Sequence, residues 1–112
     1  MNNFSKKLSD FLDEFGKGRK LVLSTADNNK VTSRMMSIVQ INGSFYFQTD
    51  KTFRKYQQIN NNPFVALCID NMQIEGVCKE IGHPIENEAF CSIYKEYFSS
   101  SYKMYTSLDN ER

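Results

Sequence analysis

The chain has 112 residues, of which 40% are hydrophobic, and its fourteen lysines and arginines nearly balance thirteen aspartates and glutamates. This length and composition suit one folded domain over residues 1–112 and exclude a disordered chain. Neither sign of charge forms a long run, so the basic footprint of a dedicated nucleic-acid binder is missing. The apolar runs are far shorter than the roughly 20 residues that cross a bilayer, and no signal peptide is recognisable. We therefore expect a cytoplasmic protein that binds neither nucleic acid nor membrane.

Residues that commonly hold metals are few. Cys68, Cys78 and Cys91 are odd in number and widely spaced, which is typical of buried free thiols rather than of a disulfide framework or a metal site. His83 is the only histidine, and a single histidine excludes a multi-histidine metal centre. We expect no metal site, and no side chain stands out as a catalytic residue.

The first half of the chain predicts a helix followed by strands. Apolar residues recur at helical spacing over residues 4–15, and Gly16 and Gly18 are placed to end that helix. The composition then changes to that of strands, which we expect over residues 21–25, 31–41 and 44–49. Asn42 and Gly43 form the strongest short hairpin signal, so the third strand should pair back antiparallel.

The second half predicts a helix, a strand pair and another helix. Aromatic and apolar residues at spacings of three predict a helix over residues 51–62, which Pro63 stops. Beyond it, the expected elements are strands over residues 64–69 and 72–81, a turn between them at Asp70 and Asn71, and a helix over residues 85–97. The serines at 99–101 should break this last helix before a short final segment.

This order of elements is that of a small mixed domain, mainly β with helices at its flanks. Antiparallel strands joined by short turns are expected to curl into a Greek-key barrel. An open sheet of this size would leave two unpaired edges, which need covering by barrel closure or by a second subunit.

Cations gather at an unusual place, the start of the predicted helix over residues 51–62. Lys51, Arg54 and Lys55 lie where the helix dipole favours anions instead. The arrangement becomes favourable if an anion binds there, and the alternative is that these are solvated helix charges. Arg34 lies inside a predicted strand, where an unpaired charge facing the core is costly, so it either points outward or meets an anion.

An ordered set of short motifs runs from about Lys20 to Ile81. The motifs are Arg34-Met35-Met36, Asn42-Gly43, the aromatic run 45–49 that ends in threonine, Arg54-Lys55, Asn61-Asn62-Pro63 and Ile74-Glu75-Gly76. In this order they resemble the pyridoxamine 5'-phosphate oxidase-like, FMN-binding split-barrel family. The resemblance covers over half of the chain and implies a split β-barrel, antiparallel and Greek-key, with flanking helices.

The resemblance also implies which residues hold the flavin. Arg34, Arg54 and Lys55 would clasp the FMN phosphate, since converging cations and donors suit a phosphate dianion. The segment after Arg34 would run beside the isoalloxazine ring and bond its pyrimidine edge through backbone groups, although its methionines are equally typical of a core. With the Thr49 hydroxyl and further flavin contacts, the implied cofactor-binding residues are Arg34, Met35, Met36, Ser37, Gln48, Thr49, Arg54, Lys55 and Asn71.

The chain departs from the oxidase itself. It has no tryptophan and one histidine, whereas the oxidase carries a C-terminal substrate-binding region rich in Trp, Arg and His. The resemblance therefore points to the small general-stress-protein-like or uncharacterised branch, and not to pyridoxamine 5'-phosphate oxidation. Members of that branch add a final strand after the second helix, which this chain lacks. Either the chain is shortened or its barrel is completed otherwise, for instance by the dimer partner.

The function implied is that of a homodimeric FMN-binding flavoprotein with the flavin at the subunit interface. It would be a flavin-dependent oxidoreductase acting on a small molecule, for which a nicotinamide could serve as electron donor. The alternatives are a flavin- or haem-binding stress or carrier protein without turnover, a barrel that holds a deazaflavin, and an interaction domain without a cofactor. Haem would need an axial ligand, and His83 is the only histidine able to serve.

Overall fold

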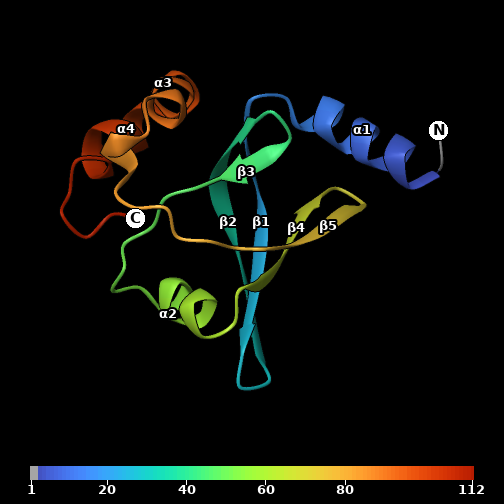
Figure 1. Cartoon of the computed structure of the whole chain (residues 1–112), viewed down its shortest axis with the longest axis horizontal. Coiled ribbons are helices and arrows are strands. Elements are labelled where there is room, and N and C mark those ends of the chain that lie inside the picture. Colours follow the sequence, from blue (N-terminus) through green and yellow to red (C-terminus); the bar gives the residue numbers. More distant parts are fainter. Residues whose placement is uncertain (1–2) are drawn as a thin grey trace.

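The computed structural model describes residues 3–112, with side chains from residue 6 onward (Figure 1). Its elements are helices α1 (Asn3–Phe15), α2 (Arg54–Asn61), α3 (Glu88–Tyr97) and α4 (Ser99–Tyr105), the 3-10 turn η1 (Pro84–Glu86), and strands β1 (Gly18–Asp27), β2 (Lys30–Ile41), β3 (Ser44–Tyr46), β4 (Phe64–Ile69) and β5 (Met72–Val77). None of the helices in this described part is both long and apolar enough to span a membrane.

One antiparallel sheet forms the centre of the molecule, with the strand order β3-β2-β1-β4-β5. The two long strands β1 and β2 pair from Gly18 opposite Val39 to Asp27 opposite Lys30. The sheet curls into a half-barrel in which β3 and β5 are the edge strands (Figure 1). The prediction of a mainly β fold with flanking helices, of the split-barrel type, is therefore confirmed.

The inner face of the curled sheet carries the main core. Helix α1 covers one end of it because the apolar stripe of the helix presents Phe11 and Phe15, each 3% exposed. Their rings meet the ring of Phe45 edge to face, with centroids 5.8 and 5.1 Å away. The buried members of this core are Phe11, Phe15, Leu21, Leu23, Met36, Ile38, Leu67 and Ile69.

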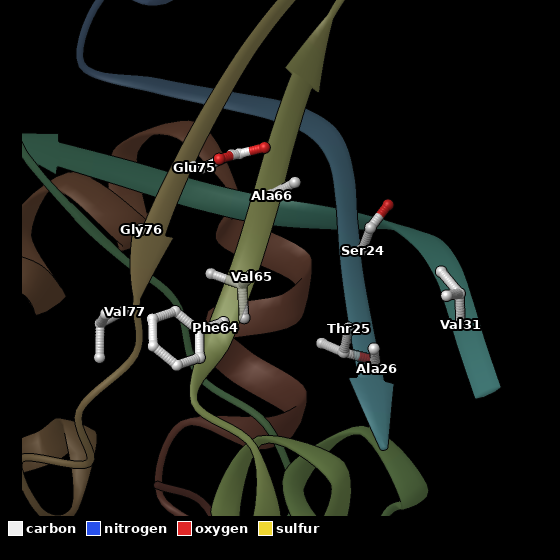
Figure 2. A pocket seen from close by; sticks show the side chains of 10 residues that line it. All are labelled: Ser24, Thr25, Ala26, Val31, Phe64, Val65, Ala66, Glu75, Gly76 and Val77. Carbon is white, nitrogen blue, oxygen red and sulfur yellow. The ribbon is translucent and has the colours of Figure 1, made fainter. Parts of the chain in front are cut away.

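Helices α3 and α4 cover only part of the outer face. Val39 of β2 is fully buried against Phe90 and Tyr94 of α3. Gly18 of β1 passes so close to Tyr97 that a Cβ atom there would lie 2.5 Å from the ring, so the packing of α3 requires glycine at this position. The rest of the outer face, over β1, β4 and β5, stays exposed (Figure 2).

Two turns follow the sequence signals. Gly16 ends α1 with a φ of +75°, and its N–H donates to Leu12 O at 3.1 Å, which is a left-handed ending that glycine adopts without strain. Asn42 and Gly43 have φ values of 52° and 83° and form the tight turn between β2 and β3.

Two strands are shorter than predicted. β3 ends at Tyr46 rather than at residue 49, because the chain leaves β2 there and Thr49 pairs with Arg112 instead. β5 ends at Val77 rather than at residue 81, and the chain then runs irregularly into η1. The end of β3 depends on a contact between distant parts of the chain, which local composition does not report.

The helix bounds also differ from the prediction. α2 begins at Arg54, so Lys51 precedes the helix and only two of the three cations lie in its first turn. The serines at 99–101 do not break a helix but form the first turn of α4. The break lies at Phe98, whose φ of −136° and ψ of 53° are not helical.

Candidate functional site

A free strand edge lies on the β3 side of β2. β3 pairs only with residues 39–41, so within the described chain this edge of β2 carries no strand along residues 30–38. Helix α2 is fixed near the far end of β1 by the side chain of Asn61, whose Nδ2 donates to Asp27 Oδ2 at 3.1 Å. Backbone groups on an uncovered edge need partners, so this edge can bind a ligand.

A buried polar cluster joins α2 to the β1–β2 pair. Gln58 is 7% exposed, and its Oε1 accepts hydrogen bonds from the hydroxyls of Thr25 and Thr32, each at 2.7 Å. These two threonines lie opposite each other in the antiparallel register. The cluster fixes the position of α2 on the inner face, because the buried hydroxyls of Thr25 and Thr32 need the amide oxygen of Gln58 as their hydrogen-bond acceptor.

Arg34 lies on this cluster. Its Nη1 donates to Leu23 O at 3.2 Å and to Thr25 Oγ1 at 3.0 Å, and its Nη2 donates to Thr32 Oγ1. Burial lowers the pKa of the Arg34 guanidinium. Within the described chain no carboxylate lies within ion-pair distance of it. The side chain is thus half-buried on the inner face, held by neutral oxygens, with its charge uncompensated.

Lys55 in the first turn of α2 faces the same region. Burial lowers the pKa of its ammonium group, and the nearby charge of Arg34 lowers it further, while Glu111 acts in the opposite direction. Its Nζ lies 5.6 Å from the centre of the Phe53 ring, a cation–π contact. Arg34 and Lys55 are thus near enough for their charges to interact, so an anion close to both would be stabilised.

Two buried oxygens without partners lie close by. Thr49 and Glu111 are 7% and 6% exposed, yet Thr49 Oγ1 and Glu111 Oε2 have no hydrogen-bond partner in the described chain. The segment of Thr49 pairs with that of Glu111, since Asp50 forms a bridge with Glu111 and Thr49 pairs with Arg112. Burial raises the pKa of the Glu111 carboxyl, with a further increase from Asp50. Sites with unpaired buried oxygens and a shifted carboxyl are candidates for ligand binding.

The predicted phosphate residues are brought together only in part. The charge of Arg34 lowers the pKa of Lys55, and Thr49 lies on the segment that pairs with Glu111, whose charge raises it. Arg54, the residue before Lys55, is exposed and forms no ion pair within the described chain. A role for Arg54 at the phosphate stays a prediction.

The predicted ring-binding residues are dispersed. Met35 is 60% exposed on the outer face, opposite to the face of Arg34, whereas Met36 is buried in the inner core. Ser37 is half-buried, on the same face as Met35. A flavin could therefore meet this segment through its backbone and through Met35, but not through the side chain of Met36.

Gln48 is connected to the site through Glu111, whose pKa its side-chain hydrogen bond lowers, whereas Asn71 lies elsewhere. Gln48 is buried toward α4, where its Oε1 accepts from Thr106 Oγ1 at 2.8 Å. Asn71 is exposed in the turn between β4 and β5, next to Asp70, whose carboxylate lies 4.0 Å from Arg19 near the α1 end of the sheet. That end is opposite to the end where Asn61 contacts Asp27. The structure does not bring Asn71 together with Arg34 and Lys55.

Sequence reasoning missed the buried polar residues that support the site, namely Gln58, Thr25, Thr32 and Glu111. The two threonines carried a weak signal, since they lie opposite each other once Asp27 to Lys30 is taken as a tight turn. Gln58 and Glu111 carried none, because a polar residue in a helix or a terminal segment is ordinarily solvated.

The three cysteines take no part in the site. Cys68, Cys78 and Cys91 are unpaired and half-buried rather than fully buried. Burial raises the pKa of Cys78 to about 11, so its thiol stays protonated at neutral pH and is a poor nucleophile.

Replacing Gln58 with alanine is expected to destabilise the fold by about 1–3 kcal/mol, because the buried hydroxyls of Thr25 and Thr32 lose their shared acceptor. Urea unfolding measures the loss. The control is the exposed Asn60→Ala on the same helix, which should change the free energy of unfolding by less than about 0.5 kcal/mol. Equal effects of the two substitutions would contradict the role given to the cluster.

Replacing Glu111 with glutamine should make the protein more stable at neutral pH and change its pH dependence. Because burial raises the pKa of Glu111 above its ordinary 4.5, the native state binds this proton more tightly than the unfolded state. The stability of the wild type therefore falls as pH rises from about 4.5 through the raised pKa, and then stays level. The variant should lack this fall. Urea unfolding at about pH 4 and about pH 8 tests it, and an equal pH response of both proteins would refute it.

These features define a fold class. An antiparallel five-stranded sheet curled into a half-barrel, with helices at its flanks, is a split barrel. Neither a protein-family model nor a curated protein sequence matches the chain. Solved structures do, and they place its fold in this class.

Three of these structures illustrate the similarity. The protein Atu2129 of Agrobacterium tumefaciens, of unknown function, superimposes on the whole chain with a TM-score of 0.76 at 17% identity, and the chain spans 53% of its length. The haem storage protein HutZ of Vibrio cholerae matches 93% of the chain with a TM-score of 0.71 and 16% identity, over 84% of its own length. A putative pyridoxamine 5'-phosphate oxidase of Listeria innocua matches 86% of the chain, with a TM-score of 0.64 and 19% identity, over 82% of its length. At these identities the similarity establishes the fold.

Proposed function

We propose that the protein binds FMN and acts as a flavin-dependent oxidoreductase on a small molecule in the cytoplasm. The observation that carries the proposal is the pair Arg34 and Lys55, two half-buried cations whose charges influence each other, with no carboxylate within ion-pair distance of Arg34 in the described chain. Burial, and after it the like charge of Arg34, lowers the pKa of Lys55, so its charged form is disfavoured in the free protein. A phosphate dianion would turn the repulsion into attraction.

The residues present fit a phosphate group. Arg34 presents a planar fork of donors and Lys55 a point charge, a combination that proteins use for phosphate recognition. The Thr49 hydroxyl is buried without a partner and is available to donate a hydrogen bond to a phosphate oxygen. Burial of these donors away from water costs little free energy once a bound anion accepts their hydrogen bonds.

The free edge of β2 is a suitable place for the flavin ring. It begins next to residues 39–41 and runs along the strand that carries Arg34. Unpaired backbone groups there can bond the pyrimidine edge of a flavin, and the exposed thioether of Met35 can pack on a flat ring. Bound FMN would supply the electron or hydride transfer, while the chain orients it and sets its electrostatic surroundings.

The exposed outer face supports a homodimer, and a flavin at the subunit interface stays an expectation from the resemblance. Figure 2 shows a groove there that Phe64 and Val77 flank on paired strands, with the small residues Ala26 and Ala66 nearby. Phe64 is 68% and Val77 65% exposed, which is unusual for large apolar side chains that lie side by side. Small and large residues on one face suit a contact with a second copy of the same face.

The first experiment is the visible absorption spectrum of the protein after addition of FMN and removal of excess by gel filtration. Retained flavin near one per subunit, followed by bleaching when NADH or NADPH is added, supports the oxidoreductase. Retained flavin without bleaching would instead support a flavin carrier without turnover. Absence of retained flavin would refute the proposal.

Haem is a weaker candidate, because both ring nitrogens of His83 are already used. Its Nε2 lies 2.7 Å from Leu108 O, and its Nδ1 accepts from the N–H of Ile85 at 3.2 Å. An axial ligand needs one of these nitrogens free. A deazaflavin would use the same phosphate pair, and titration with either flavin compares their affinities directly.

Replacing Phe64 with glutamate is expected to convert a dimer into monomers, because it places a charge in the middle of the apolar outer face. Sedimentation analysis measures the change. The matched control is Ile85→Glu, which adds the same charge at a residue that is 59% exposed and lies outside this groove. Dimers that survive the first substitution, or that both substitutions disrupt alike, would contradict this interface.

A further inference from the structure

The guanidinium group of Arg34 has donors that the protein leaves unused. A guanidinium carries five N–H donors in one plane, one on Nε and two on each Nη atom. Here Nη1 donates to Leu23 O at 3.2 Å and to Thr25 Oγ1 at 3.0 Å, and Nη2 donates once, to Thr32 Oγ1. Within the described chain, the N–H of Nε and the second N–H of Nη2 therefore have no protein acceptor.

The two unused donors lie on one edge of the guanidinium plane. Thr25 Oγ1 and Thr32 Oγ1 lie 3.1 Å apart, which suits the end of the group, where the two Nη atoms lie side by side. The pair that remains, on Nε and Nη2, is parallel, and this is a fork with which arginine binds two oxygens of one carboxylate or phosphate. Arg34 thus keeps a complete edge for an anion while neutral oxygens accept from its other donors.

The side chain of Gln58 orients the two threonine hydroxyls. Because arginine only donates, each hydroxyl oxygen accepts from Arg34 and has its own proton to donate elsewhere. Both protons go to Gln58 Oε1, which lies 2.7 Å from each hydroxyl oxygen. Gln58 is 7% exposed and its amide is neutral, so the network is complete although it leaves the charge of Arg34 uncompensated.

We propose that Gln58 is a positioning residue for the anion site. Through Thr25 and Thr32 it holds the end of the Arg34 guanidinium and leaves the edge of Nε and Nη2, with its charge, for the phosphate group of the ligand. The inference rests on the proposed function, which assigns FMN to this site. Such an arrangement favours binding, because the ligand does not have to order an arginine side chain that has many rotamers.

The first test is Gln58→Glu, which keeps an acceptor for both hydroxyls but adds a negative charge two hydrogen bonds away from Arg34. The carboxylate would compensate the guanidinium and repel the phosphate, so FMN should bind at least about tenfold more weakly, as measured by fluorescence quenching. The matched control is Asn60→Asp, the same change from amide to carboxylate at an exposed position of α2. It should alter the affinity by less than about twofold.

Two substitutions of Thr32 test the positioning without adding a charge. Thr32→Val keeps the shape of the side chain but removes the hydroxyl that bonds to both Arg34 and Gln58. FMN binding should weaken about three- to tenfold, because Nη2 loses its fixed partner and the fork is no longer held in place. Thr32→Ser keeps the hydroxyl and should bind FMN within about twofold of the wild type. If the cluster only joined α2 to the sheet, folded Thr32→Val would keep its FMN affinity.

A third measurement needs no ligand. The urea midpoint is compared for Gln58→Glu made in the wild type and made in Arg34→Met. With Arg34 present, the new carboxylate has a cation close by, whereas in Arg34→Met it is buried without that partner. Gln58→Glu should therefore lower the urea midpoint more in the Arg34→Met protein than in the wild type.

Two results would overturn the inference while flavin binding stands: Gln58→Glu binds FMN as tightly as the wild type, or Thr32→Val and Thr32→Ser bind it alike. If Gln58→Glu does not fold, the two Thr32 variants decide. A wild type that retains no FMN would refute the proposed function instead, and the urea comparison then decides the role of Gln58. An equal loss in both proteins would overturn that role, whereas a larger loss without Arg34 would support it at a site for another anion.

Discussion

Replacing Lys55 with methionine is expected to weaken FMN binding about ten- to hundredfold and to leave the fold intact. The reason is that a charge-assisted hydrogen bond to a phosphate contributes about 1.5–3 kcal/mol, and each 1.4 kcal/mol is about a factor of ten in affinity. The fold should survive because burial and Arg34 already make the charge of Lys55 unfavourable in the free protein, as its lowered pKa shows. Without ligand the variant should be at least as stable as the wild type.

Flavin fluorescence quenching measures this effect. The matched control is Lys7→Met, which removes the same charge from the exposed face of α1 and should leave FMN affinity unchanged within about twofold. Arg54→Met tests the resemblance against the structure. The resemblance places Arg54 at the phosphate, whereas the structure leaves it exposed, so we expect this substitution to weaken FMN binding less than Lys55→Met does. If Lys55→Met binds FMN as the wild type does, the phosphate site is not where we place it.

Replacing Leu23 with alanine is expected to cost about 2–5 kcal/mol of the free energy of unfolding. Leu23 is 0% exposed, it lies in the central strand β1, and it pairs with Arg34 on one side and with Leu67 on the other. Removal of its side chain leaves a cavity that a sheet held on both sides cannot close. The loss is a large part of the roughly 5–15 kcal/mol that stabilises an ordinary domain.

Urea denaturation followed by circular dichroism tests the role of Leu23. The matched control is Leu108→Ala, the same chemical change at a residue that is 49% exposed, for which we expect a cost below about 1 kcal/mol. If the two substitutions cost the same, the inner face does not form the core that the register implies.

Much of the fold could be predicted because its signals are local. The spacing of Phe11 and Phe15 predicts the apolar stripe of α1, and the pair Asn42 and Gly43 predicts a hairpin because few residues adopt positive φ at low cost. The order of helices and strands followed from such signals. The bounds of β3, β5 and α4 did not, because pairing with Arg112 and packing beyond Phe98 involve distant contacts.

The candidate site, too, could be predicted from the sequence only in part. The sequence by itself determined that Arg34 and Lys55 are cations in places where a free charge is costly, and hence that an anion is expected. Only the tertiary structure decided that the charges of these two residues influence each other while Arg54 is exposed, Met36 is buried and Asn71 lies at the other end of the sheet.

The physical reason is the difference between composition and register. The sequence shows the charge and size of each residue, but strand pairing decides on which face of the sheet its side chain lies. Because side chains alternate along a strand, a shift of the register by one residue moves every side chain to the opposite face. The buried contacts of Gln58 join it to Thr32 and Thr25, which are 26 and 33 residues away, and Glu111 depends on the bridge to Asp50. Such contacts exist only once the chain has folded, so local sequence does not report them.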